Sequence, residues 1–270
     1  MIGFRPGVVC GLNAGVAAGI SADPLGTAFS LATVAKDATS NIYCPASAAQ
    51  WTQALGVAGI GSGGPFGLWL CQEASGNLAD SIGSFTLTVA GAPTYQNAIA
   101  GWTRKALHTT DGGSQGWSTT SASLPNIGST SCLLLIYLNL TANPAATHIA
   151  AVQGTTTSKV EFTSSSVPVI TSAGNSQTGS TAVTTTVVPV VQKVDRTNSV
   201  VTLYTLADKI TPTFSGTMTG QKLLLGTDVG SGGSPVSYLY AAAFQGAAAE
   251  LSDARVKSLL QTLGWSPTWS

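Results

Sequence analysis

From residue 66 onward, short apolar runs alternate with short polar turns. Residues 187–195 and 200–206 are rich in β-branched and aromatic side chains, and the polar residues 196–199 between them predict a hairpin turn. Residues 131–140 lack a polar face, which predicts a strand in the middle of a sheet. Further strands are expected at residues 66–71, 84–89, 102–108, 148–153, 160–163, 167–171, 182–188, 222–227 and 237–244, with a loop at 175–180. Many short, closely spaced strands predict a two-sheet sandwich.

Two stretches show helical spacing of apolar residues instead. Near the end of the chain, four apolar residues recur at i, i+3, i+4 and i+7: Val256, Leu259, Leu260 and Leu263. Ser252 is placed to cap this helix, and Gly264 follows its last turn. A second helix is expected at residues 47–57, where Trp51 and Leu55 lie on one face.

The last third of the chain resembles the laminin-G-like, concanavalin A-like jelly-roll family in the order of its motifs. The matching stretches are residues 190–197, 200–205, 223–227, 243–246 and 251–260, with weaker matches at 73–81 and 102–109. The resemblance implies an all-β fold, a two-sheet antiparallel jelly-roll sandwich. It also implies a short C-terminal helix, and such a fold is shared by proteins of many functions.

The first 64 residues differ from the remainder and are rich in Gly and Ala. Their apolar content is too low to form a separate core, so they either fold back on the sandwich or dock on a neighbouring protein. We expect residues 1–64 to be an anchoring arm with one short helix and residues 65–270 to be the jelly-roll domain. Because exposed aromatic residues mark contact surfaces, the expected contacts of the arm are Phe29, Tyr43, Trp51 and Leu55.

Composition narrows the range of partners. Charged residues make up only 8% of the chain, against about a quarter in an average globular protein. Such a surface repels itself weakly, so we expect much of it to meet other protein, including copies of the same chain. The formal net charge is zero, which gives no electrostatic reason to expect a nucleic-acid or anionic-membrane partner. No run is long and apolar enough to cross a bilayer.

The start of the chain and the cysteines indicate the compartment. Residues 1–20 include an Ala, Gly and Val stretch but lack the Leu-rich core of a secretory signal. The four cysteines have no metal-ligand spacing. Cys132 opens the most apolar run, which favours a buried, reduced thiol. We therefore expect a protein that folds in the cytosol, and disulfides stay open as an alternative.

Candidate catalytic residues are few. The paired carboxylates of a glycosidase are not evident, because Glu161 has no acidic neighbour along its strand, and Glu250 and Asp253 flank a helix start. His108 and His148 lie in different expected strands, and no Ser lies in a Gly-x-Ser-x-Gly elbow. The glycine-rich residues 61–64 lack the Lys-Ser/Thr ending of a phosphate-binding loop. The sequence therefore predicts no enzyme activity and no cofactor.

Calcium binding would require about six or more oxygen ligands. Asp111, Asp195 and Asp228 lie beside Gly- or Ser-rich turns, and none belongs to a dense acidic loop. Turn formation explains each of them. We therefore expect no metal site.

Carbohydrate binding is the main alternative function. Trp102 and Trp117 bracket the loop at 111–116, with Tyr95 and Gln115 close in sequence. Aromatic faces and polar side chains together suit sugar C–H groups and hydroxyls. Alternation along the strands is equally compatible with both tryptophans being buried in the core or in a partner interface.

The sequence thus leads to two hypotheses. The first is a structural protein of a bacteriophage virion, a capsid decoration (cement) protein or a module of a head or tail fibre. It would assemble in the host cytoplasm and dock on other virion proteins through residues 1–64. The second is a carbohydrate-binding adhesin module that recognises glycans on the host surface. Both rest on composition and on the resemblance, and neither rests on a site.

Overall fold

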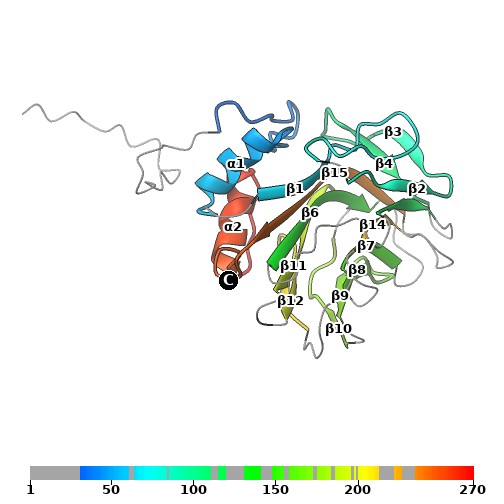
Figure 1. Cartoon of the computed structure of the whole chain (residues 1–270). Helices are drawn as coiled ribbons and strands as arrows, with labels where there is room; N and C mark the ends of the chain where they lie inside the picture. The colour runs from blue at the N-terminus through cyan, green and yellow to red at the C-terminus, as the bar shows by residue number, and fades with distance from the viewer. Residues whose placement is uncertain are drawn as a thin grey trace, which may run out of the picture.

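Two antiparallel β-sheets, packed face to face, make up most of the molecule (Figure 1). The computed structural model describes residues 31–60, 64–83, 85–110, 115–119, 131–140, 148–154, 158–172, 175–183, 186–195, 198, 200–212, 222–226 and 235–270. For residues 148–154 and for Lys222, it describes the backbone alone. The predicted all-β sandwich is confirmed.

The larger sheet has eight strands. In spatial order these are β13 (Lys209–Ile210), β12 (Val200–Tyr204), β11 (Val188–Asp195), β6 (Ser131–Leu140), β15 (Val236–Gly246), β4 (Lys105–His108) and β3 (Thr94–Ala98), and β1 (Gly64–Trp69) also pairs with β15. The predicted hairpin is present as the β11–β12 pair, in which Val191 is opposite Tyr204.

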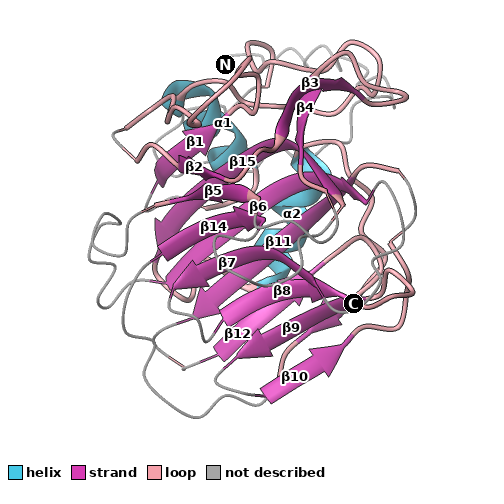
Figure 2. Cartoon of the chain, turned by 90° about the vertical axis from the view of Figure 1, so that its right-hand side faces the viewer, coloured by secondary structure: helices cyan, strands magenta, loops and turns pink. Residues whose placement is uncertain are grey.

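The second sheet has seven strands and covers one face of the larger sheet (Figure 2). Its spatial order is β10 (Asn175–Thr178), β9 (Pro168–Ser172), β8 (Ser158–Phe162), β7 (His148–Gly154), β14 (Lys222–Gly226), β5 (Gly116–Ser118) and β2 (Thr88–Ala90). Every pairing in both sheets is antiparallel.

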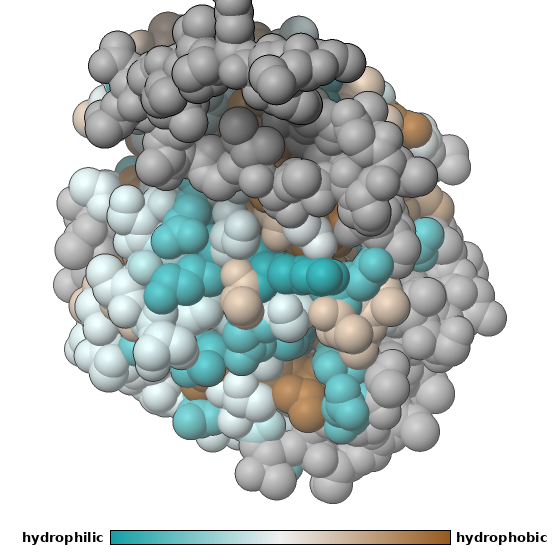
Figure 3. Space-filling model, turned by 90° about the vertical axis from the view of Figure 1, so that its left-hand side faces the viewer, coloured by the Kyte–Doolittle hydropathy of each residue, from teal (hydrophilic) through white to brown (hydrophobic). Residues whose placement is uncertain are grey.

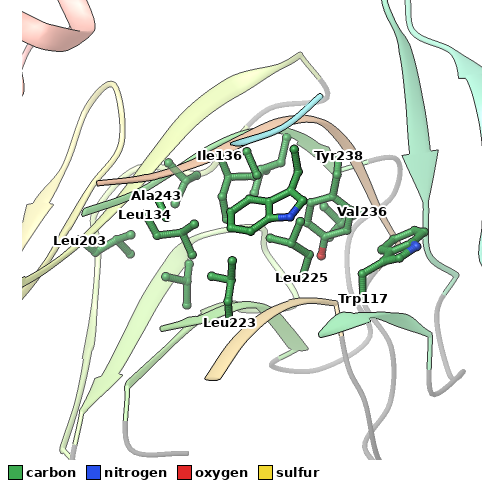
Figure 4. Close-up of a cluster of buried hydrophobic side chains, with 14 of the residues drawn as sticks. Trp117, Leu134, Ile136, Leu203, Leu223, Leu225, Val236, Tyr238 and Ala243 are labelled. Atoms are coloured by element: carbon green, nitrogen blue, oxygen red, sulfur yellow. The ribbon is translucent and has the colours of Figure 1, made fainter. Parts of the chain in front are cut away.

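Strand β6 lies between β11 and β15 and is buried along its whole length. Leu134 and Ile136 face the second sheet, whereas Leu133 and Leu135 face the opposite side. A strand without a polar face therefore serves two cores, as its sequence predicts. Between the sheets, buried side chains from both layers meet in one cluster, which includes Trp117, Leu134, Ile136, Leu203, Leu223, Leu225, Val236, Tyr238 and Ala243 (Figure 4).

The outer face of the larger sheet is covered by the helices α1 (Ala48–Val57) and α2 (Asp253–Thr262), which lie together on one side of the sandwich (Figure 1). Both helices were predicted. Ser47 caps α1 by accepting a hydrogen bond from the Gln50 N–H group. Ser252 is in the capping position of α2, but its side chain makes no capping hydrogen bond. The surface on this side is mostly hydrophilic or neutral, with apolar residues scattered over it (Figure 3).

Residues 31–60 pack against the sandwich and share a hydrophobic cluster with its larger sheet. The indole Nε1 of Trp51 donates a hydrogen bond of 2.7 Å to the Tyr240 hydroxyl, which in turn donates to the Pro45 carbonyl. The hydroxyl of Tyr137 donates to the Tyr43 carbonyl at 3.0 Å. Of the two alternatives for this part of the chain, folding back is thus what residues 31–60 do. The domain boundary at residue 64 stays a prediction.

Several predicted elements differ from the structure. Residues 175–178 form a strand, because their backbone pairs with β9 although all four side chains are exposed. The described residues among 182–188 form no strand before Val188. Directly before them, the carboxylate of Asp208 accepts hydrogen bonds from the N–H groups of Ser180 and Thr181, outside any strand. Strand β3 was not predicted, since its sequence is polar.

Candidate functional site

The residues proposed for glycan binding do not form one surface. Trp117 is fully buried, and its ring contacts Tyr238 and Tyr95 in edge-to-face geometry, at 6.2 Å and 5.9 Å between ring centres. Gln115 accepts a hydrogen bond from the Thr110 N–H group at 2.9 Å. These contacts place Trp117 in the core between the sheets, with the partly buried Tyr95 packed against it.

Trp102 belongs to a different layer of the molecule. It packs on the outer face of the larger sheet, where its ring lies 6.2 Å from that of Tyr137 and 6.2 Å from that of Trp265. Trp102 is half-buried, so part of its surface stays accessible. Of the two tryptophans, only Trp102 retains a surface for a ligand.

The predicted contacts of the N-terminal arm are also placed by the structure. Trp51 and Leu55 are buried against the chain's own sheet, at 0% and 3% exposure. Their apolar surface is therefore already covered within the chain and is not free for a partner protein. Tyr43 is half-buried, and Phe29 lies outside the described residues.

An open pocket of about 280 Å³ lies where three segments of the chain meet. It is lined by Ala35, Lys36, Asp37, Ala38, Cys44, Gln72, Thr103 and Arg104. The volume is near the lower end of the range for ligand pockets, about 300–1,000 Å³. We call it the Arg104 cavity. No sequence motif indicated it, because its residues come from the segment before α1, the loop after β1 and the loop before β4.

The carboxylate of Asp37 holds two of these segments together. Its oxygens accept hydrogen bonds from the N–H groups of Thr39 and Ser40 in its own turn, at 3.1 and 2.9 Å. They also accept from those of Thr103 and Arg104 across the cavity, at 3.1 and 3.0 Å. Burial alone would raise the pKa of Asp37, but these backbone hydrogen bonds hold it below its ordinary value. Asp37 is therefore ionised and engaged by the backbone.

Two cations line the same cavity. The guanidinium of Arg104 donates from Nη2 to the Leu70 carbonyl at 2.7 Å and lies 5.8 Å from the centre of the Tyr240 ring. Its Nε is buried and has no hydrogen-bond partner among the described residues. Lys36 is exposed, and its ammonium lies 5.2 Å from the centre of the Tyr43 ring. Neither cation forms an ion pair with a carboxylate of the described residues.

The remaining polar groups of the cavity are neutral. The Gln72 amide donates to the Lys105 carbonyl at 2.7 Å, and the Thr103 hydroxyl shares a hydrogen bond of 2.9 Å with the Thr39 hydroxyl. Burial raises the pKa of the Cys44 thiol to about 12, so it stays protonated and unreactive as a nucleophile. Since these groups are engaged within the protein, the guanidinium of Arg104 and the ammonium of Lys36 are the donors that the cavity offers to a ligand.

The other titratable residues considered as catalytic or metal-binding candidates do not line this cavity. Glu161 pairs with Lys159 at 2.7 Å. Asp195 accepts from the N–H group of Asn198, as expected for a turn residue, whereas Asp111 and Asp228 lie outside the described residues. His108 contacts the Ser237 hydroxyl at 3.2 Å, and burial lowers its pKa. The side chain of His148 lies outside the described part.

Neither a metal-ligand cluster nor a membrane-spanning helix is found among the described residues. No group of three or more His, Cys, Asp or Glu side chains there is placed to hold a metal ion. In the same residues, no helix has the length and apolar character needed to cross a membrane.

Comparisons with known proteins give matches in fold but not in sequence. No family model matches the chain, and no curated protein matches it. Trypanosoma rangeli sialidase in complex with sialic acid matches with a TM-score of 0.55 and 11% identity, over 72% of this chain and 32% of the sialidase chain. The binding domain of botulinum neurotoxin DC in complex with SialylT matches with a TM-score of 0.51 and 11% identity, over 74% of this chain and 51% of the toxin chain.

These matches define the class of the protein as a β-sandwich of the jelly-roll type. At this level of identity, the likeness shows the fold alone, and the chain spans only about a third of the sialidase and about half of the toxin chain. The comparison corrects the expectation that the protein is not an enzyme, because the sialidases that share its fold are enzymes. The fold therefore gives no argument against catalysis.

Proposed function

We propose that the protein is a carbohydrate-binding module and that its ligand binds in the Arg104 cavity. The observation that carries the proposal is the cavity itself, whose polar groups are held in place before any ligand arrives. Asp37 fixes the backbone at Thr103 and Arg104, and the Leu70 carbonyl fixes the guanidinium. Such pre-organised donors lower the entropy lost on binding.

The fold comparisons support the same proposal. A sialidase in complex with sialic acid and a toxin binding domain in complex with SialylT both match more than two thirds of this chain. The half-exposed ring of Trp102 directly precedes Thr103, which lines the cavity. Aromatic faces and polar side chains together suit the C–H groups and hydroxyls of a sugar, and Trp102 is the residue next to this lining segment.

A glycan array probed with the intact protein tests this proposal. We expect a set of related glycans to be bound, and Arg104→Ala to reduce the signal strongly. Lys105→Ala is the matched control, because Lys105 is exposed, follows Arg104 directly and does not line the cavity. Glycan binding that survives Arg104→Ala unchanged would show that the cavity is not the site.

An assembly function is a second candidate, and the observation in its favour is the low charge of the chain, 8%. We propose that such a protein would belong to a bacteriophage virion, form homo-oligomers and dock on capsid or tail proteins. Deleting residues 1–64 would remove Trp51 from the core, so deletion of residues 2–30 is the cleaner test. Loss of incorporation into particles would support docking through the N-terminal segment, and unchanged incorporation would contradict it.

A further inference from the structure

We infer that the Arg104 cavity selects an acidic sugar, one that carries a carboxylate, over its neutral counterpart. This inference rests on the proposed carbohydrate-binding function and names the ligand class. It follows from how the charges of the cavity are distributed: two cations lack an ionic partner, and the one anion that lines the cavity is fully engaged.

Asp37 offsets one of the two positive charges, but its carboxylate has no acceptor site left for a ligand. An ionised carboxylate offers about four lone-pair sites. Asp37 fills them with the N–H groups of Thr39, Ser40, Thr103 and Arg104, and it also accepts from the Ser40 hydroxyl at 3.1 Å. No acceptor site of this carboxylate is thus left for a sugar hydroxyl, and the ionised groups that line the cavity, Lys36, Asp37 and Arg104, sum to one net positive charge.

The two cations of the cavity are available to pair with an anionic ligand. Lys36 and Arg104 form no ion pair with the carboxylates of the described residues, and Arg104 uses one N–H group on the Leu70 carbonyl. The planar guanidinium matches the two oxygens of a carboxylate, and a nearby ammonium adds a second positive charge. A neutral sugar in this cavity would leave the net positive charge of its lining uncompensated.

The size of the cavity and the surrounding charge favour a small anionic group. A volume of about 280 Å³ suits one sugar residue rather than an extended polyanion. The chain as a whole has a formal net charge of zero. This balance disfavours nucleic acid, which would require a wider basic surface.

The test compares matched glycans by isothermal titration, using the intact protein. The probes are uronate-containing and sialylated oligosaccharides, the same oligosaccharides without the carboxylate, and sulfated versions. We expect the carboxylated probe to bind at least about tenfold more tightly than its neutral counterpart and to weaken as salt is raised. Lys36→Ala should reduce this preference, and Lys105→Ala should leave it unchanged.

The outcomes separate the inference from the proposed function. Equal binding of neutral and carboxylated probes would overturn the acidic preference while the carbohydrate-binding function stands. Binding of sulfated probes alone would overturn the carboxylate assignment. Binding of no probe, by protein whose melting curve shows that it is folded, would overturn both. Because Lys36 is exposed, its replacement tests the site without the risk that Arg104→Ala unfolds the loop.

Discussion

At the residue scale, Asp37 joins two segments that lie more than sixty residues apart in the sequence. Its carboxylate accepts from backbone N–H groups of its own turn and from those of Thr103 and Arg104. The geometry of the cavity depends on this carboxylate, because it fixes the backbone that carries the guanidinium.

Replacing Asp37 with Ala should therefore lower both stability and binding. Several backbone N–H groups would lose their acceptor, which should reduce the free energy of unfolding by about 1–3 kcal/mol. Urea unfolding measures this loss, and titration with glycan measures binding. Asp37→Asn keeps one acceptor oxygen and should give an intermediate loss. Wild-type stability in Asp37→Ala would contradict the account of this turn.

The carboxylate of Asp253 leads to a second prediction at this scale, on how stability depends on pH. Burial alone would raise its pKa, but hydrogen bonds from Lys193 at 2.8 Å and from Tyr204 at 2.6 Å lower it from 3.8 to about 2. A carboxylate with a lowered pKa stabilises the fold above its ordinary pKa, and this contribution is lost as the pH falls from about 5 through about 2.

Wild-type protein should therefore lose more stability on acidification than the Asp253→Asn variant. The side chain is 44% exposed, so screening by solvent limits the difference to about 1 kcal/mol. Urea unfolding at a series of pH values between neutral and strongly acidic measures it. Parallel pH profiles for the two proteins would show that this ion pair contributes nothing to stability.

At the scale of elements, the segment before β1 behaves as part of the sandwich. Trp51 lies in edge-to-face contact with Phe244, with 4.4 Å between ring centres, and donates a hydrogen bond to Tyr240. Helix α1 thus covers the outer face of β15, the strand that also carries β1 on its edge.

Replacing Trp51 with Ala should destabilise the whole protein by about 3–5 kcal/mol, because a fully buried indole is removed from a packed core. Thermal or urea unfolding followed by circular dichroism measures the change. Thr52→Ala is the control on the same helix, since Thr52 is exposed. A Trp51→Ala variant as stable as the control would mean that α1 detaches from the sheet in solution.

The sequence predicted those elements whose pattern reflects burial. Residues 131–140, 187–195 and 237–244 are apolar because they lie inside, and both helices repeat apolar residues at helical spacing. Edge strands lack this pattern of buried apolar residues. Strand β10 is polar and exposed along its whole length, and only its hydrogen bonds to β9 make it a strand.

The candidate site could not be predicted from the sequence for a similar reason. Lys36, Gln72 and Arg104 are brought together by long-range packing, and nothing in their spacing indicates it. Asp37 accepts hydrogen bonds within its own turn, but its bonds to Thr103 and Arg104 cross between segments, which no local pattern indicates. Conversely, Trp102 and Trp117 are close in sequence, yet they pack on opposite faces of the larger sheet.

At the scale of the whole molecule, the two faces of the larger sheet are covered by different elements. The second sheet closes the inner face of the larger sheet, and the helices with residues 31–60 close the outer face. The Arg104 cavity lies where this outer cover meets the loops that follow β1 and precede β4. Ligand binding there should stabilise the outer cover against the sheet.

A crystal structure of the protein with a carboxylated glycan that it binds on an array tests the central claim most directly. The account predicts that the sugar occupies the Arg104 cavity, with its carboxylate on the Arg104 guanidinium and near the Lys36 ammonium. A sugar bound elsewhere, with the cavity unchanged and free of sugar, would contradict it.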